Sequence, residues 1–333
     1  MKLSEIGEFG FIERFSHRFE DYLVDDSTGI GDDCAILPSN DDHDLVITTD
    51  MLVEDIHFIR NKISALDLGH KSLAVNLSDI AAMGGQPISS FLSVAIPKDI
   101  EVEYLDELME GYHQLSKSYK LPLMGGDTTR SSKKLVLNIS VIGKVPKGTA
   151  KLRSSAKKGD IIAVTNRLGD SAGGLHVIIN NLPENALNSY LVYKHVHPNP
   201  HVKQGLWLGN KKAVNAMMDV SDGIASDLNH ILKASGLGAS IELSKLPISD
   251  QLKEFSSQYK LNPYELAVSG GEDYCLLLTI EANSFEQIAK EYKAVIGTEL
   301  FPIGVITDGE QIEWTKNNKT IEGQLKGGFN HFL

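Results

Sequence analysis

A set of aspartates stands at positions where folding alone does not call for an acid. Several of them follow glycines or a β-branched run, and one interrupts an apolar helical segment. If they converge, like charges about 4 Å apart repel by roughly 4 kcal/mol per pair at an effective dielectric near 20, so the cluster requires cations. Oxygen-only ligation favours Mg²⁺ over Zn²⁺. The set comprises Asp32, Asp33, Asp50, Asp79, Asp127, Asp219 and Asp222.

Each aspartate taken alone also has a simpler interpretation as a turn or helix-capping residue, and Asp32 and Asp222 fit that role best. The set carries more weight because most of its members sit beside a predicted strand end or a glycine turn. In open α/β sheets, ligands bind at that edge. The sequence therefore predicts a magnesium site built from distant parts of the chain.

The common nucleotide-binding motifs are absent. Gly29 and Gly31 could begin a dinucleotide fingerprint, but Cys34 stands where the third glycine is needed. The chain has no G-x-x-x-x-G-K-[ST] loop, and it lacks the H-R-D and D-F-G motifs of protein kinases. The spacing of Asp219 and Asp222 fits no EF-hand loop. A nucleotide would have to bind through the metal ions instead.

Other short motifs leave alternatives open. The pairs Gly125-Gly126 and Gly270-Gly271 permit close approach of the backbone to an anion, but they are equally typical of turns. The run from Gly169 to Ser171 could offer N–H groups to a phosphate, although a plain N-cap is the simpler interpretation. The histidines 195, 197 and 201 are interrupted by prolines, so we expect an exposed loop there and not a metal cluster.

Composition narrows the class of protein. A length of 333 residues favours two domains. The net charge of -12 argues against nucleic acid as a partner. Cys34 and Cys275 are the only cysteines, which suits a reducing cytoplasm. The N-terminus lacks an apolar leader, and no run approaches the ~18 apolar residues of a membrane span, so we expect a cytoplasmic protein without membrane contact.

Hydrophobic periodicity predicts alternating strands and helices in both halves, and therefore α/β (α+β) architecture. In the first half we expect helices over 5–19, 67–83 and 101–119, and strands over 35–37, 45–49, 91–97 and 135–143. The pattern pauses near residue 148, where we place a domain boundary. In the second half we expect strands over 160–165, 216–220, 239–243, 275–280 and 303–306, and helices over 170–180 and 224–235.

The helix over 67–83 is the clearest element, with Asp67 as its expected cap. Ser72, Asn76 and Asp79 share one stripe on it. Because the helix is apolar nearly all round, we expect this stripe to be buried, and a buried aspartate needs a cation or several donors.

Seven short motifs along the chain resemble those of a known family. The motifs are 29–35 (GIGDDCA), 48–50 (TTD), 57–58 (HF), 71–84 (KSLAVNLSDIAAMG), 125–130 (GGDTTR), 219–223 (DVSDG) and 269–274 (SGGEDY). In this order they closely resemble the thiamine-monophosphate kinases, a family within the wider superfamily of aminoimidazole ribonucleotide synthetase and selenophosphate synthetase. The resemblance runs from about residue 5 to the C-terminus.

The resemblance implies ATP-dependent phosphorylation of thiamine monophosphate to thiamine diphosphate, the last step of thiamine diphosphate biosynthesis, by direct in-line transfer assisted by several Mg²⁺ ions. It implies an N-terminal domain over 1–148 that binds ATP and magnesium and whose mixed sheet pairs across a homodimer, and a C-terminal α/β domain over 149–333 that closes over the substrate. No side chain is expected to act as acid, base or nucleophile.

The resemblance also assigns site residues. The implied metal ligands are Asp33, Thr48, Thr49, Asp50, Asp79, Asp127, Asp219 and Asp222. The implied ATP contacts are Gly126, Asp127, Arg153 and Ser221, and the implied substrate contacts are His57, Glu272 and Phe329. Phe329 replaces a tyrosine of the family, which keeps an aromatic face but loses a hydroxyl. His201 stands where relatives often carry arginine. Asp32 is expected to have a structural role.

Two other functions remain open at this point. Another activity of the superfamily would make a different phosphate intermediate, although the reactive N-terminal cysteine region expected for selenophosphate synthesis is absent. A non-catalytic protein that binds magnesium or nucleotide is the alternative from a different class. Release of ADP that depends on thiamine monophosphate distinguishes these possibilities.

Overall fold

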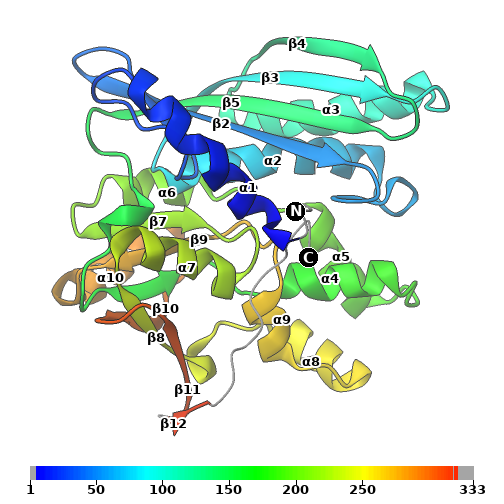
Figure 1. The fold of residues 1–333 in the computed structure, drawn as a ribbon. Coiled ribbons are helices and arrows are strands. Elements are labelled where there is room, and N and C mark those ends of the chain that lie inside the picture. Colours follow the sequence, from blue (N-terminus) through cyan, green and yellow to red (C-terminus); the bar gives the residue numbers. More distant parts are fainter. Residues whose placement is uncertain (1–4, 318, 322–333) are drawn as a thin grey trace.

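The computed structural model of the chain describes residues 5–317 and 319–321. Figure 1 shows two sheets, one formed by the first half of the chain in the upper part of the view and one by the second half below it. The first sheet has the strand order β1-β2-β5-β3-β4, in which only β3 and β4 pair in parallel. Its strands are β1 (Ala35–Pro38), β2 (His43–Val53), β3 (Gln86–Ile96), β4 (Leu123–Arg130) and β5 (Val136–Pro146).

Helices cover one face of the first sheet. Helix α1 (Gly7–Ser16) precedes the sheet, and helices α2 (Ala65–Ala82) and α3 (Val102–Tyr119) lie against each other, with α2 on the strands (Figure 1). Side chains alternate along β2, so Val46, Thr48 and Leu52 are buried on the helical side, whereas Met51 on the opposite face is 54% exposed. The second face of this sheet therefore remains open.

The second sheet has the order β12-β11-β8-β10-β6-β9-β7, and only β8 and β11 pair in parallel. Its strands are β6 (Ile161–Val164), β7 (Val214–Asp219), β8 (Gly238–Glu242), β9 (Leu276–Ile280), β10 (Phe301–Thr307), β11 (Ile312–Lys316) and β12 (Lys319–Thr320). The helices of this half are α4 (Asp170–Ile179), α5 (Ala186–Val196), α6 (Val202–Gly209), α7 (Ile224–Ser235), α8 (Asp250–Tyr259), α9 (Pro263–Ser269) and α10 (Phe285–Ile296).

Helix α2 lies between the two sheets, which explains its apolar character on all sides. Leu73, Leu77 and Ile80 are fully buried, and they share one apolar cluster with Met217 of β7 and Leu278 of β9. Helix α6 also packs on α2, where a Cβ added at Gly205 would lie 2.2 Å from the carbonyl oxygen of Ala81. The absence of a side chain at Gly205 thus permits the close contact between the halves.

The expected helices and strands are confirmed, with shifts of a few residues at their ends. Helix α2 begins differently from the prediction. Ser64, and not Asp67, is the N-cap, because its Oγ accepts a hydrogen bond from the backbone N–H of Asp67. The helix ends at Ala82, and Gly84, the expected stop signal, follows its C-cap with φ at +73°.

Two expectations about the aspartates are wrong. Strand β2 does not end on Asp50 but continues to Val53, because its pairing with β5 runs from His43 to Val53. Asp127 does not follow a glycine turn, since Gly125 and Gly126 lie within β4, an edge strand whose residues are all exposed. The hairpin of β11 and β12 was not predicted. None of the described helices is both long and apolar enough to cross a membrane.

Candidate active site

Three of the predicted aspartates meet between the sheets. Asp33 comes from the loop before β1, Asp79 from the last turns of α2, and Asp219 from the end of β7. One carboxylate oxygen from each lies within 4.8 Å of the others. Residues as distant in the sequence as Asp33 and Asp219 therefore meet because α2 packs against both sheets.

Neighbouring groups hold these carboxylates in place. The hydroxyl of Thr48 donates to Asp79 Oδ2 at 2.5 Å, and the hydroxyl of Ser78 donates to Asp219 Oδ2 at 2.5 Å. Asp50, two residues after Thr48, lies on the same face of β2, and its backbone N–H donates to Asn76 Oδ1 at 3.1 Å. The stripe predicted on α2 thus faces the cluster through Asn76 and Asp79.

Arg153 and Asp32 flank the cluster. Arg153 Nη2 lies 2.6 Å from Asp33 Oδ1 in a buried ion pair. Asp32 Oδ1 accepts from the backbone N–H of Asp33, and its Oδ2 accepts from the backbone N–H of Arg153 at 3.1 Å. Asp32 therefore fixes the turn that presents Asp33 and the segment that presents Arg153.

Burial and mutual repulsion make the cluster unfavourable in its fully ionised form. Burial, followed by the charge of Asp33, raises the pKa of Asp219 from 3.8 to about 8. Burial also raises the pKa of Asp50 to about 6, and burial together with Asp50 and Asp219 raises that of Asp79 well above its ordinary value. These shifts indicate carboxylates whose negative charge Arg153 offsets only in part.

The chemistry of this donor set fits magnesium. Asp33 Oδ2 is buried and has no hydrogen-bond partner among the described residues, so an acceptor lone pair is left for a cation. The converging ligand atoms are all oxygens, which Mg²⁺ prefers. Asp33, Asp79 and Asp219 would hold such an ion, with Asp50 and Thr48 beside them.

Other predicted ligands do not join this cluster within one chain. The side chain of Thr49 faces the open side of the sheet, where its hydroxyl donates to the carbonyl of Ile139 and accepts from Ser140. Gly126 and Asp127 lie on β4, three strands from β2, or about 14 Å away. The N-cap of α7 is Gly223, and Asp227 accepts from the backbone N–H groups of residues 222 and 223.

A second group of charged side chains surrounds Glu272. Lys71 Nζ lies 2.9 Å from Glu272 Oε1, and His195 Nδ1 lies 3.3 Å from Glu272 Oε2. Although burial acts in the opposite direction, Lys71 and His195 hold the pKa of Glu272 below its ordinary value. His57 also acts on this carboxylate electrostatically, and its Nδ1 accepts from the backbone N–H of Val53. Phe329 lies outside the described residues.

The expectation of an exposed histidine loop is wrong. His195 and His201 are 5% and 3% exposed, and burial lowers the pKa of each to about 4. His201 Nδ1 pairs with the hydroxyl of Thr165 at 2.9 Å, so this residue is a neutral core side chain. His197 stacks on His70 of α2 with ring centroids 3.4 Å apart.

At the start of α4, two of the N–H groups that could bind a phosphate already donate to a carboxylate. The backbone N–H groups of Gly169 and Ser171 donate to the carboxylate of Asp273, at 2.7 and 3.3 Å. The sequence reasoning missed Asp273 as well as Lys71. A lysine inside an apolar helix and a second acid directly after Glu272 were the available signals.

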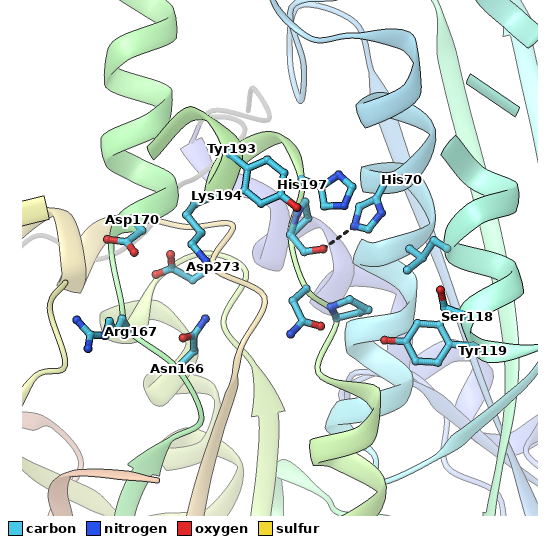
Figure 2. A pocket seen from close by; sticks show the side chains of 14 residues that line it. His70, Ser118, Tyr119, Asn166, Arg167, Asp170, Tyr193, Lys194, His197 and Asp273 are labelled. Atoms are coloured by element: carbon cyan, nitrogen blue, oxygen red, sulfur yellow. Dashed lines mark hydrogen bonds between the residues drawn. The ribbon is translucent and has the colours of Figure 1, made fainter. Parts of the chain in front are cut away.

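A cavity of about 380 Å³ lies between the C-terminal part of α3 and the loop after β6. Figure 2 shows the side chains that line it. His70 and Asp273 line it, each the chain neighbour of a member of the Lys71–Glu272 pair. His70 Nε2 lies 2.8 Å from the carbonyl oxygen of Pro198, the contact drawn dashed in the figure. The cavity contains none of the clustered aspartates and is separate from them.

Comparison with known families agrees with this arrangement. The family model described as AIR synthase related protein, N-terminal domain, matches residues 31–145. The model described as AIR synthase related protein, C-terminal domain, matches residues 157–316. The first match spans strands β1 to β5 except for the last residue of β5, and the second spans strands β6 to β11.

Individual proteins match along nearly the full chain. A thiamine-monophosphate kinase of Buchnera aphidicola subsp. Acyrthosiphon pisum is 40% identical over 329 residues, 98% of each chain. That of Escherichia coli K12 is 42% identical over 276 residues, 82% of each chain. A solved structure named "AaThiL complexed with AMPPCP and TMP" is 31% identical, with a TM-score of 0.87 over 99% of each chain.

Proposed function

The chain belongs to the thiamine-monophosphate kinase family, and from this premise we propose that it transfers the γ-phosphoryl group of ATP to thiamine monophosphate, giving ADP and thiamine diphosphate. The observation that carries the proposal is the buried carboxylate cluster of Asp33, Asp79 and Asp219. The helix that carries Asp79 also carries Lys71 of the Lys71–Glu272 pair, in a chain that matches its relatives over nearly their whole length.

The side chains suit a reaction between two anions. Mg²⁺ bound at the carboxylates would neutralise and align the phosphates. Thr48 and Ser78 orient the carboxylates through hydrogen bonds, and Arg153 adds a positive charge beside Asp33. The attacking group is a phosphate oxygen whose second pKa is about 6, so it needs no general base near neutrality. Positioning is then the main task of the protein.

Helix α2 provides an axis along which the acceptor would lie. Lys71 and Asp79 are eight residues apart on α2, or about 12 Å along the helix. Glu272 and His57 near Lys71 would contact the rings of thiamine monophosphate, while its phosphate would extend toward the aspartates. The negative charge of Glu272 complements the cationic thiazolium ring.

We further propose a homodimer formed through the open face of the first sheet. This face carries exposed apolar side chains, including Met51 at 54% and Phe91 at 38%. The edge strand β4 is exposed throughout and carries Gly126 and Asp127, which lie too far from the cluster of their own chain. A second copy would cover the apolar face and could bring these residues to an ATP site.

Two further assignments accompany this proposal. A domain boundary near residue 148 is supported by the change from the first to the second sheet between β5 and β6. A cytoplasmic setting is supported by Cys34 and Cys275, which are buried and unpaired, as expected in a reducing compartment.

The dimer predicts a specific effect of a charge at its centre. Met51→Asp should convert a dimer into a monomer in light-scattering chromatography, because an aspartate buried between two apolar sheet faces is unpaired. The matched control is Val295→Asp on α10, at a site of similar exposure (53%) far from this face, which should stay dimeric. A wild-type monomer, or an unchanged dimer of Met51→Asp, would contradict the proposed interface.

The activity is tested by ADP release. The purified chain with ATP and Mg²⁺ should release ADP continuously only after thiamine monophosphate is added, at a kcat on the order of 1–100 s⁻¹. Thiamine diphosphate should accumulate in equal amount, as measured by chromatography.

The same assay separates the alternatives. ATP consumption with aminoimidazole precursors or selenide, but not with thiamine monophosphate, would favour another activity of the superfamily. Binding of ATP without hydrolysis under any condition would favour the non-catalytic protein. A burst of ADP equal to the enzyme concentration with ATP alone would indicate a phosphoenzyme and overturn direct transfer.

A further inference from the structure

Lys71 is an unusual residue for the middle of a packed helix. Its side chain is 1% exposed, and it is among the largest fully buried side chains described. A buried ammonium is strongly unfavourable unless an anion lies beside it. Glu272 Oε1, at 2.9 Å, is that anion. The contact is an ion pair and not a well-formed hydrogen bond, because Nζ has no partner of suitable angle among the described residues.

Glu272 is held from several directions. Its backbone adopts φ of +64°, a left-handed conformation that is costly for a residue with a side chain. Its backbone N–H donates to the carbonyl of Ser221 at 2.7 Å. A Cβ at the preceding Gly271 would lie 2.3 Å from that same carbonyl oxygen, so only glycine fits there. The loop is thus fixed against the segment that follows Asp219.

The carboxylate of Glu272 is held by two nitrogen-bearing side chains on different elements. Lys71 on α2 contacts one oxygen, and His195 on α5 contacts the other. His195 Nδ1 in turn lies 3.0 Å from the hydroxyl of Ser171. The side chain of Glu272 nevertheless remains 25% exposed, so part of it faces outward while both oxygens are oriented from within.

We propose that Lys71 is a positioning residue for the acceptor substrate: its buried ammonium, together with His195, orients Glu272 so that the exposed part of the carboxylate binds the ring end of thiamine monophosphate. The inference rests on the proposed function. Nothing in a purely structural role requires a strained backbone, an exposed carboxylate edge and a lysine without well-formed hydrogen bonds at one place.

The test is Lys71→Met, which keeps the length of the side chain and removes its charge. Without the ammonium the carboxylate loses the contact that orients one of its oxygens. We expect the KM for thiamine monophosphate to rise about 10- to 100-fold, while the KM for ATP changes less than about threefold. Calorimetric titration with thiamine monophosphate should show the same loss of affinity without turnover.

A double-mutant cycle shows whether Lys71 acts through Glu272. Lys71→Met combined with Glu272→Gln should bind thiamine monophosphate no more weakly than the worse single variant, because both changes disable one interaction. If the two losses of affinity multiplied in the double variant, Lys71 would act on substrate binding independently of Glu272. Lys71→Arg keeps the positive charge but moves it, so its affinity for thiamine monophosphate should lie between those of wild type and Lys71→Met.

Lys151→Met is the matched control. Lys151 is also a buried lysine, but its ammonium donates to the backbone carbonyls of Lys211 and Val214. It should lose stability without a selective loss of affinity for thiamine monophosphate. If Lys71→Met does not fold, Lys71→Arg carries the test, with weaker binding of thiamine monophosphate and unchanged binding of ATP expected.

The outcomes separate the inference from the proposed function. A wild-type chain without ADP release dependent on thiamine monophosphate would refute the function. An active wild type, with folded Lys71 variants whose affinities for both substrates are unchanged or fall equally, would overturn only the role of Lys71.

Discussion

Asp79→Asn should lower kcat at least about 100-fold, equivalent to roughly 3 kcal/mol of transition-state stabilisation. Asp79 is the member of the cluster that comes from α2, and its carboxylate lies among those of Asp33 and Asp219. Asparagine keeps the shape and can still accept from Thr48, but it is a neutral and weaker ligand for a cation. Steady-state kinetics at saturating Mg²⁺ measures the effect.

The fold should survive this change. Burial and the charges of Asp50 and Asp219 already disfavour an ionised Asp79, so loss of its charge removes repulsion. We expect the melting temperature in EDTA to be equal to or above that of wild type. Asp44→Asn is the matched control, since Asp44 is a buried aspartate outside the cluster that accepts from the backbone N–H of Gly148. Near-normal turnover of Asp79→Asn would exclude it as a ligand.

The central helix was predictable because its apolar residues cover all sides. Such a helix must be buried between layers, so a polar stripe on it had to face other polar groups. Asn76 and Asp79 fulfil this, whereas Ser72 satisfies its hydroxyl within the helix by donating to the carbonyl of Gly69. Periodicity therefore located the buried stripe but not which of its members serve the site.

The way in which the aspartates converge was not predictable from the expected sheet edge. Both sheets are largely antiparallel, and their strand ends do not meet at one carboxyl edge. The cluster forms instead around α2, which touches β2 and β7 from opposite sides. The positions of Thr49 and Asp127 depend on strand register and order, which are set by pairing between distant segments.

The group of charged side chains around Glu272 could not be predicted from the sequence, for a related reason. Glu272 was expected as a substrate contact, but its partners Lys71 and His195 are distant in sequence and meet it only through tertiary packing. The histidines were misjudged because prolines at 198 and 200 suggested an exposed loop. In the structure α5 and α6 bury His195 and His201 on either side of that turn.

Magnesium should stabilise the chain more strongly as pH rises. The pKa of Asp219 is raised to about 8, so the folded state retains a proton that the unfolded state has lost. The stabilisation that Asp219 gives the folded state is fully present below its ordinary pKa of 3.8, and it is lost as the pH rises through about 8. In EDTA we expect the melting temperature to fall by roughly 3 °C between pH 7 and 8.5. Calorimetry measures it.

A cation that replaces the retained protons should reverse this trend, because Mg²⁺ binds the ionised carboxylates that repel one another. The difference in melting temperature between Mg²⁺ and EDTA should therefore grow from pH 7 to 8.5. This range also avoids the buried His195 and His201, whose lowered pKa values remove stability only as pH falls from 6.5 toward about 4.

Asp219→Asn provides the decisive comparison. It should make the decline in EDTA shallower, because one of the titrating carboxylates is gone, and it should reduce the Mg²⁺-dependent gain at pH 8.5. Burial raises the pKa of Asp273 to about 7, so a small decline that Mg²⁺ does not reverse is expected to persist in the variant. A Mg²⁺ effect of equal size at both pH values would mean that binding displaces no retained proton, and it would refute the titration of Asp219 in this range.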